Sequence, residues 1–155
     1  MSKDYENELQ GQKRKADVEL INARCRQHAR LDQVSQRAGG GGQLTYIEGN
    51  SLIDNMNEVF GSTGWNTRII SQDGALSPNG KWEYMCMIEV SVPAYGATKQ
   101  DVGYGSGERE KASKEAVTDA LKRACRQFGN YFGNSLYDKE HLAALDRERK
   151  QKNTK

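Results

Sequence analysis

The segment from Trp82 to Val92 alternates in polarity so regularly that it predicts a β-strand with one buried face. Apolar and aromatic side chains fill every second position, namely Trp82, Tyr84, Cys86, Ile88, Val90 and Val92. Between them stand Glu83, Met85, Met87, Glu89 and Ser91. Because successive side chains of a strand point to opposite faces, this pattern requires a core on one side only. The chain must therefore build a sheet and cover one of its faces.

Neighbouring segments predict one further strand on each side of this one. Residues 65–71 are typical of a strand, and the turn-rich residues 73–80 contain Asn79-Gly80, a strong hairpin signal. Pro93 ends the central strand, and residues 98–104 predict a strand that runs back beside it. The three strands together predict an antiparallel β-meander.

A long helix follows the three strands and can cover their apolar face. Within residues 107–130, alanines recur at four-residue spacing, at Ala112, Ala116, Ala120 and Ala124. Such a row of small side chains lies on one helix face and lets the helix pack close against a sheet. With shorter helices predicted over residues 49–60 and 138–149, the body has the order β-β-β-α and the fold class is α+β.

Composition divides the chain into three parts. Residues 1–37 are highly charged and predict an N-terminal helical arm, with a helix over about 13–36 and a partly disordered start. The glycine run Gly39–Gly42 then predicts a flexible hinge. Residues 38–146 hold nearly all aromatic and β-branched side chains and form the folded body. Residues 147–155 predict a basic, disordered tail.

Several classes of protein are excluded. No apolar run approaches the ~20 residues of a membrane-spanning helix, and residues 1–30 lack the apolar centre of a secretory signal. Three widely spaced cysteines and two histidines predict neither a disulfide framework nor a metal site, so we expect a reducing compartment, no metal and no cofactor. Glu48, Asp101 and Asp119 show no paired or metal-ligand spacing, so hydrolysis is not indicated. A net charge of +2 is a weak argument against a polyanionic partner.

The glycine-rich segment Gly103–Gly107 precedes the long helix and has two interpretations. Glycines before a helix can present backbone N–H groups to a phosphate. However, this spacing matches neither a dinucleotide fingerprint nor a Walker loop. A tight strand-to-helix turn with Ser106 as the N-cap is therefore the favoured interpretation.

The C-terminal half of the long helix, Leu121–Phe128, carries three cations and no acid, at Lys122, Arg123 and Arg126. Lys122 and Arg126 lie four residues apart and share one helix face. Cations near the end of a helix also interact favourably with its dipole. A solvated face and a polyanion site are therefore equally good interpretations of this cluster taken alone.

Basic and aromatic residues also mix near the predicted strand ends, at Arg37, Tyr46, Lys81, Trp82 and Tyr104. Single-stranded nucleic acid is bound by such a combination, because cations meet the phosphates and flat rings or a shaped groove meet the bases. Trp82 lies on the apolar face of its strand and is better explained as a core residue.

Several long segments of the body have an unusual composition. They are RAGGGGQLTYIEG (37–49), NEVFGSTGW (57–65), DVGYG (101–105), KEAVTDALKRACRQFGN (114–130) and LYDKEHL (136–142). In sequence and in order they resemble the DNA-binding domain of the Rad-fifty-two family, eukaryotic-type single-strand annealing proteins of homologous recombination. The length of the matching segments makes this resemblance specific.

The resemblance implies a β-β-β-α body whose subunits associate side by side into a homo-oligomeric ring. A basic groove around the ring would hold single-stranded DNA by its backbone, with the bases turned outward. The inner-groove residues implied in this way are Arg37, Tyr46, Lys122, Arg123 and Arg126.

The family also has an outer DNA site, used for duplex DNA or a second strand, which corresponds here to Lys81 and Lys139. A further lysine of that site has no equivalent, and an expected arginine falls on Ala143, so we expect the outer site to be incomplete. The family's long C-terminal region, which binds the recombinase and the single-strand-binding protein, is not matched. A mediator role is therefore not expected from these residues.

The expected function is single-stranded DNA binding and annealing of complementary strands, without catalysis, in homologous recombination and double-strand break repair. A nonspecific RNA-binding or RNA-annealing chaperone is the alternative, and an enzyme acting on nucleic acid is a third hypothesis. The expected partners are single-stranded DNA, further copies of the chain, and duplex DNA or RNA, but not a membrane. The expected location is the nucleus in a eukaryote and otherwise the cytoplasm, with an organelle as a further option.

Overall fold

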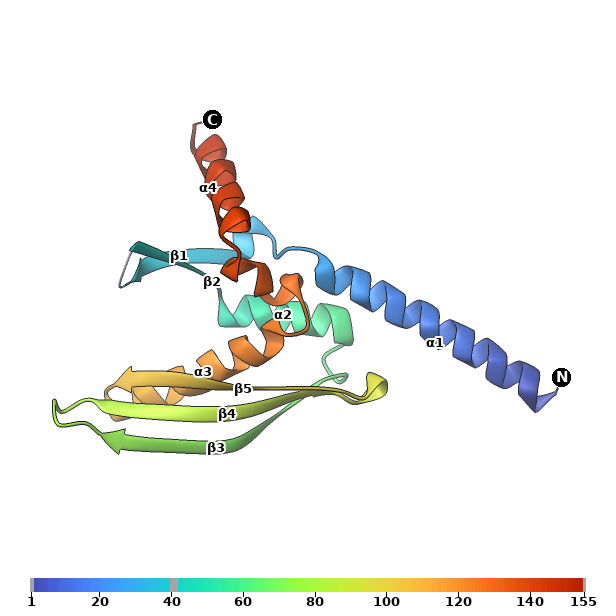
Figure 1. The fold of residues 1–155 in the computed structure, drawn as a ribbon, viewed down its shortest axis with the longest axis horizontal. Helices are drawn as coiled ribbons and strands as arrows, with labels where there is room; N and C mark the ends of the chain where they lie inside the picture. The colour runs from blue at the N-terminus through green and yellow to red at the C-terminus, as the bar shows by residue number, and fades with distance from the viewer. Residues whose placement is uncertain (1, 40–41, 155) are drawn as a thin grey trace.

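The computed structural model describes residues 2–39 and 42–154, which form two antiparallel sheets and the helices around them (Figure 1). The larger sheet contains, in this order, β3 (Asn66–Leu76), β4 (Trp82–Val92) and β5 (Ala97–Gly107). The smaller sheet pairs β1 (Val34–Gly39) with β2 (Gly42–Ile47). The architecture is therefore mixed α/β with antiparallel sheets.

The helices surround these sheets. The α-helices are α1 (Lys3–Arg26), α2 (Gly49–Phe60), α3 (Arg109–Arg126) and α4 (Lys139–Asn153). Short 3-10 helices connect them, namely η1 (Leu31–Gln33), η2 (Pro93–Tyr95), η3 (Asn130–Phe132) and η4 (Asn134–Tyr137). Across the part of the chain that the structure describes, none of the helices has the length and apolar character needed to cross a membrane.

β4 has the alternation that its sequence predicts. Cys86, Ile88, Val90 and Val92 are at most 2% exposed, and β4 begins and ends at the predicted residues. The two outer strands are longer than predicted, because each pairs with β4 along nearly its whole length. Backbone pairing of this kind does not depend on side-chain polarity, so sequence alternation did not show it.

α3 lies against β4 and β5 and covers the buried face of the sheet. The four alanines of its predicted row are all 0% exposed. Gly103 and Gly105 of β5 face this row, and neither has room for a side chain. A Cβ at Gly103 would lie 2.5 Å from the carbonyl oxygen of Ala116, and one at Gly105 would lie 2.7 Å from the nitrogen of Ala116. The close contact of β5 with α3 thus fixes the position of the helix and of the side chains that it carries.

The predicted helix over residues 13–36 was wrong in its C-terminal part. α1 ends at Arg26, and residues 34–39 form β1, which pairs with β2 from Val34 opposite Ile47 to Gly39 opposite Gly42. The apolar periodicity of this region is weak, and pairing between the two halves of a glycine-rich segment outweighs it. Two residues of the predicted hinge, Gly40 and Gly41, lie outside the described residues.

Both ends of the chain contain more helix than the sequence predicts. α1 begins at Lys3, where the hydroxyl of Ser2 accepts a hydrogen bond from the N–H of Tyr5 at 3.4 Å. α4 continues to Asn153 and so covers most of the segment predicted as a tail. Figure 1 shows α1 and α4 extending away from the sheets in different directions.

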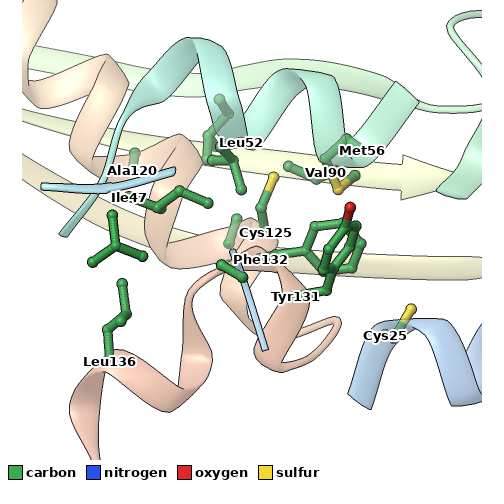
Figure 2. Close-up of a cluster of buried hydrophobic side chains, with 14 of the residues drawn as sticks. Cys25, Ile47, Leu52, Met56, Val90, Ala120, Cys125, Tyr131, Phe132 and Leu136 are labelled. Atoms are coloured by element: carbon green, nitrogen blue, oxygen red, sulfur yellow. The ribbon is translucent and has the colours of Figure 1, made fainter. Parts of the chain in front are cut away.

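The hydrophobic core is formed by α2, α3, the buried face of β4 and the segment after α3. Figure 2 shows Leu52 and Met56 of α2 together with Cys125 of α3 and Phe132 of η3. All four side chains are 0% exposed. Burial raises the pKa of the Cys125 thiol to about 12, so this cysteine is a packing residue and stays protonated.

Buried polar groups attach the β1–β2 hairpin to this core. The side-chain amides of Gln33 and Asn55 exchange hydrogen bonds of 2.8 and 3.2 Å, and Asn55 also donates to the carbonyl oxygen of Tyr131 at 2.9 Å. Arg149 of α4 donates to the carbonyl oxygen of Val34 at 2.8 Å. The base of the hairpin is therefore held by both α2 and α4.

Candidate nucleic-acid interface

A groove of about 360 Å³ lies between the β1–β2 hairpin and the C-terminal half of α3. Its lining includes all five residues that the family resemblance implies for the inner site, namely Arg37, Tyr46, Lys122, Arg123 and Arg126. An adjoining hollow shares four of these residues and extends to Tyr104 on β5. Side chains that are distant in the sequence thus meet at one concave, basic surface.

Two of these cations lie near the ring of Tyr46. The guanidinium carbon of Arg37 is 5.7 Å from the ring centroid, and the ammonium nitrogen of Lys122 is 5.0 Å from it. Arg37 comes from β1, Tyr46 from β2 and Lys122 from α3. The negatively polarised face of an aromatic ring attracts cations, so Tyr46 favours the approach of two like charges to one place.

Lys122 is half-buried, and this burial lowers the pKa of its ammonium group. The carboxylate of Glu48 opposes the effect, whereas the positive charge of Arg37 adds to it. A phosphate at this position would favour the charged form of Lys122. Its negative charge would replace the stabilisation by water that the ammonium group loses on burial. An anionic ligand in the groove would therefore stabilise the charged ammonium group of Lys122.

Arg123 is held by a carboxylate on its own helix. Its Nε donates to Oδ2 of Asp119 at 3.0 Å, and the same oxygen accepts the backbone N–H of Tyr104 at 3.0 Å. The hydrogen bond to Asp119 is the main cause that raises the pKa of Arg123. The guanidinium is therefore charged at every pH at which the protein works.

Arg126 packs over the exposed ring of Tyr137, with its guanidinium carbon 4.4 Å from the ring centroid. Its Nη1 donates to Oδ1 of Asn134 at 3.3 Å. Its Nε is buried and has no hydrogen-bond partner among the described residues. An unpaired buried N–H is unfavourable, and a phosphate oxygen is one acceptor that would relieve it.

The two residues assigned to the outer site lie elsewhere. Lys81 is exposed in the turn between β3 and β4, where its backbone N–H donates to Oδ1 of Asn79 at 3.1 Å. Lys139 is exposed at the first position of α4. Neither belongs to the described residues that line the groove.

Trp82 was expected in the core, but it is half-buried at the start of β4 and is not part of the core cluster; the guanidinium carbon of Arg109 lies 4.8 Å from the centroid of its ring. Ser106 was the wrong choice of N-cap, because β5 continues through it and Glu108 precedes the first turn of α3. The glycines before α3 serve close packing with the helix, as described above.

Sequence reasoning missed two residues of the groove. Asp119 was not recognised as a partner of Arg123, although its spacing of four from Arg123 is that of a helical ion pair. Tyr137 lies in η4, after a segment rich in glycine and asparagine that interrupts the helices. No local sequence pattern predicts that it lies near Arg126. Within the described residues, no group of three or more potential metal ligands occurs.

Comparisons with known proteins show the family to which the chain belongs. Residues 17–155 match the family described as "Rad52/22 family double-strand break repair protein". The DNA repair and recombination protein RAD52 of Saccharomyces cerevisiae is 41% identical over 128 residues, which are 75% of this chain and 27% of that protein. The DNA repair and recombination protein rti1 of Schizosaccharomyces pombe is 41% identical over 128 residues, which are 74% of this chain and 34% of that protein.

A third relative extends the match further along the chain. The DNA repair and recombination protein radC of Emericella nidulans is 38% identical over 145 residues, which are 84% of this chain and 25% of that protein. The chain spans about a quarter to a third of the length of these relatives. The match to the family profile covers most of the chain and includes every groove residue described above, and the chain belongs to the Rad52/22 family of double-strand break repair proteins.

Proposed function

We propose that this chain binds single-stranded DNA in the groove between the β1–β2 hairpin and α3, and that it anneals complementary strands in homologous recombination and double-strand break repair. The observation that carries the proposal is the convergence of Arg37, Lys122, Arg123 and Arg126 on one groove. Family membership supports the same function, since the relatives are DNA repair and recombination proteins. A nuclear location belongs to this proposal.

The mechanism is physical, and no covalent bond is made or broken. The groove cations neutralise phosphates and release the counterions that surround the strand. Contacts to the backbone leave the base edges free, so a complementary strand can pair with DNA that is already extended. Base pairing then supplies the free energy of annealing.

A side-by-side homo-oligomeric ring is part of the proposal. β3 is an edge strand of the larger sheet and exposes Ile69, Ile70 and Leu76 by 50%, 38% and 58%. Edge strands with exposed apolar residues favour association with another chain. Repeating one groove in every subunit would bind a long strand more tightly than a single groove can.

The outer site is the weaker component of the proposal. Lys81 and Lys139 are exposed and can each meet a phosphate of duplex DNA or of a second strand.

The comparisons give no support to the RNA-annealing alternative, because the relatives are named for DNA repair. Competition between DNA and RNA oligonucleotides of one sequence tests this choice, and a strong preference for RNA would overturn it.

The groove is tested by Lys122→Ala and Arg123→Ala, with binding of a labelled oligothymidine measured by fluorescence anisotropy. Each variant should bind about tenfold more weakly, because a charge-assisted hydrogen bond to phosphate is lost. Lys114→Ala is the matched control, since Lys114 lies on the same helix but outside the groove and pairs with Glu110 at 2.9 Å. Wild-type affinity in both groove variants, with unchanged thermal unfolding, would contradict the assignment.

Annealing and assembly need a separate experiment. Complementary labelled strands are mixed with the wild-type protein and with Arg123→Ala, while native mass spectrometry reports the oligomeric state. We expect oligomers in both samples and fast annealing only with the wild type. A protein that is monomeric, or one that binds DNA without accelerating annealing, would contradict the proposal.

A further inference from the structure

We infer that Asp119 is a positioning residue for Arg123: its carboxylate holds the guanidinium by Nε and leaves Nη1 and Nη2 available to a phosphate in the groove. The inference rests on the proposed single-strand site and adds a residue that pre-organises it. Asp119 also lines the groove, so this acid stands among the cations that would bind DNA.

The geometry around Asp119 is that of a fixed support. Its Oδ2 accepts both the Nε of Arg123 and the backbone N–H of Tyr104, each at 3.0 Å. The Tyr104 donor belongs to β5, so the carboxylate is held by the sheet as well as by its own helix. An ordinary surface ion pair between two flexible side chains has no such fixed point.

The choice of nitrogen decides what Arg123 can still do. Guanidinium has five N–H donors, and it meets phosphate best through two parallel hydrogen bonds. Among the described residues, only the Nε of Arg123 makes a hydrogen bond, so both terminal nitrogens remain for DNA. Because a free arginine has many rotamers, ordering it before DNA arrives lowers the entropy lost on binding.

The Gly-Tyr-Gly segment of β5 also helps to hold Asp119 in place. Gly103 and Gly105 let α3 lie directly on β5, which brings the N–H of Tyr104 within reach of Asp119. A carboxylate also repels phosphate, so its presence in a groove for a polyanion is unfavourable by charge alone. Its two hydrogen bonds at this place explain why an acid stands there.

Removing Asp119 therefore has two opposite effects on affinity, and a double-mutant cycle separates them. We would measure oligothymidine binding by anisotropy for the wild type, Asp119→Ala, Arg123→Ala and the double variant at one salt concentration. Arg123→Ala should weaken the wild type by about tenfold but the Asp119→Ala protein by less than about threefold, because an unheld Arg123 contributes little. Asp119→Asn keeps an oxygen acceptor without the charge and should restore part of the Arg123 contribution.

Lys122→Ala provides the control for general distortion of the groove. Lys122 makes no hydrogen bond to Asp119 and is coupled to it only through charge, so the effect of Lys122→Ala should depend on Asp119 much less than the effect of Arg123→Ala does. If Asp119→Ala fails to fold, the same cycle is measured with Asp119→Asn. A smaller effect of both Arg123→Ala and Lys122→Ala in the Asp119 variant would show a distorted groove and overturn the inference.

The outcomes distinguish this inference from the function on which it rests. If Arg123→Ala weakens binding by the same factor with and without Asp119, the DNA site stands and the positioning role is wrong. If Arg123→Ala leaves the affinity of the wild-type protein unchanged, the proposed site itself fails, and the inference fails with it.

Discussion

At the scale of single residues, the ring of Tyr46 has a role that substitution can test. We expect Tyr46→Phe to bind single-stranded DNA like the wild type, because the ring that attracts Arg37 and Lys122 remains. Tyr46→Leu should bind about fivefold more weakly, since a cation–π contact contributes about 1 kcal/mol. Anisotropy with labelled oligothymidine measures the difference.

An oligonucleotide without bases provides the control for Tyr46. If the ring positions cations, Tyr46→Leu should weaken binding to abasic DNA as much as binding to oligothymidine. If the ring instead stacks on a base, the loss should be confined to DNA that carries bases, where stacking contributes about 1–3 kcal/mol. That second result would contradict the positioning of Arg37 and Lys122 by Tyr46.

A second residue, His141, gives the stability of the protein a dependence on pH. Its ring on α4 stacks on the ring of His28, which follows α1, with the centroids 3.9 Å apart. Burial, and then the charge of His28, lower the pKa of His141 below its ordinary value of 6.5, while Asp138 and Glu148 oppose the shift. In the unfolded chain His141 therefore takes up its proton at a higher pH than in the folded protein.

The sign of the pH effect follows from this difference. As pH falls through about 6.5, the unfolded state gains protons first, so the free energy of unfolding should fall and then level off below the folded-state pKa. His141→Gln should flatten this part of the curve. Urea unfolding between about pH 5 and pH 8 measures it, and an equal slope in both proteins would remove His141 as the cause.

At the scale of elements, the contact between β5 and α3 determines where the groove cations lie. Gly103→Ala should lower the free energy of unfolding by about 1–3 kcal/mol, because the new Cβ overlaps the backbone of α3 and forces the helix away from β5. DNA affinity should fall with it, since α3 must shift. Gly11→Ala on exposed α1 is the matched control; nothing lies within 4 Å there, and we expect no loss of stability. Urea unfolding and anisotropy measure both variants.

The same elements show how far sequence could predict this fold. The alternation of β4 and the alanine row of α3 each repeat with the period of one element, so both were predicted and are confirmed. β1 and β2 depend on pairing between residues up to thirteen apart in a glycine-rich segment, and no period within either strand indicates it. The groove cations came from the family resemblance, whereas the role of Asp119 depends on a backbone donor from another element.

At the scale of the whole molecule, the charge of +2 does not describe the surface that DNA would meet. Acidic and basic residues are mixed on α1 and in the first half of α3, while the groove brings together four cations and one acid, Asp119, from separate parts of the sequence. The local field follows this arrangement and not the total. In a ring the same local excess of positive charge would recur in every subunit.

Repetition of the groove around a ring predicts how the affinity for DNA depends on salt concentration. If Arg37, Lys122, Arg123 and Arg126 each neutralise one phosphate, the slope of log affinity against log salt should be about −2.8 for DNA that reaches one groove, from about −0.7 per phosphate. Longer DNA that reaches several subunits should give a steeper slope in proportion. Arg123→Ala should make the one-groove slope shallower by about 0.7. A slope that does not change with DNA length, in a protein shown to be oligomeric, would mean that the grooves do not join into one continuous path.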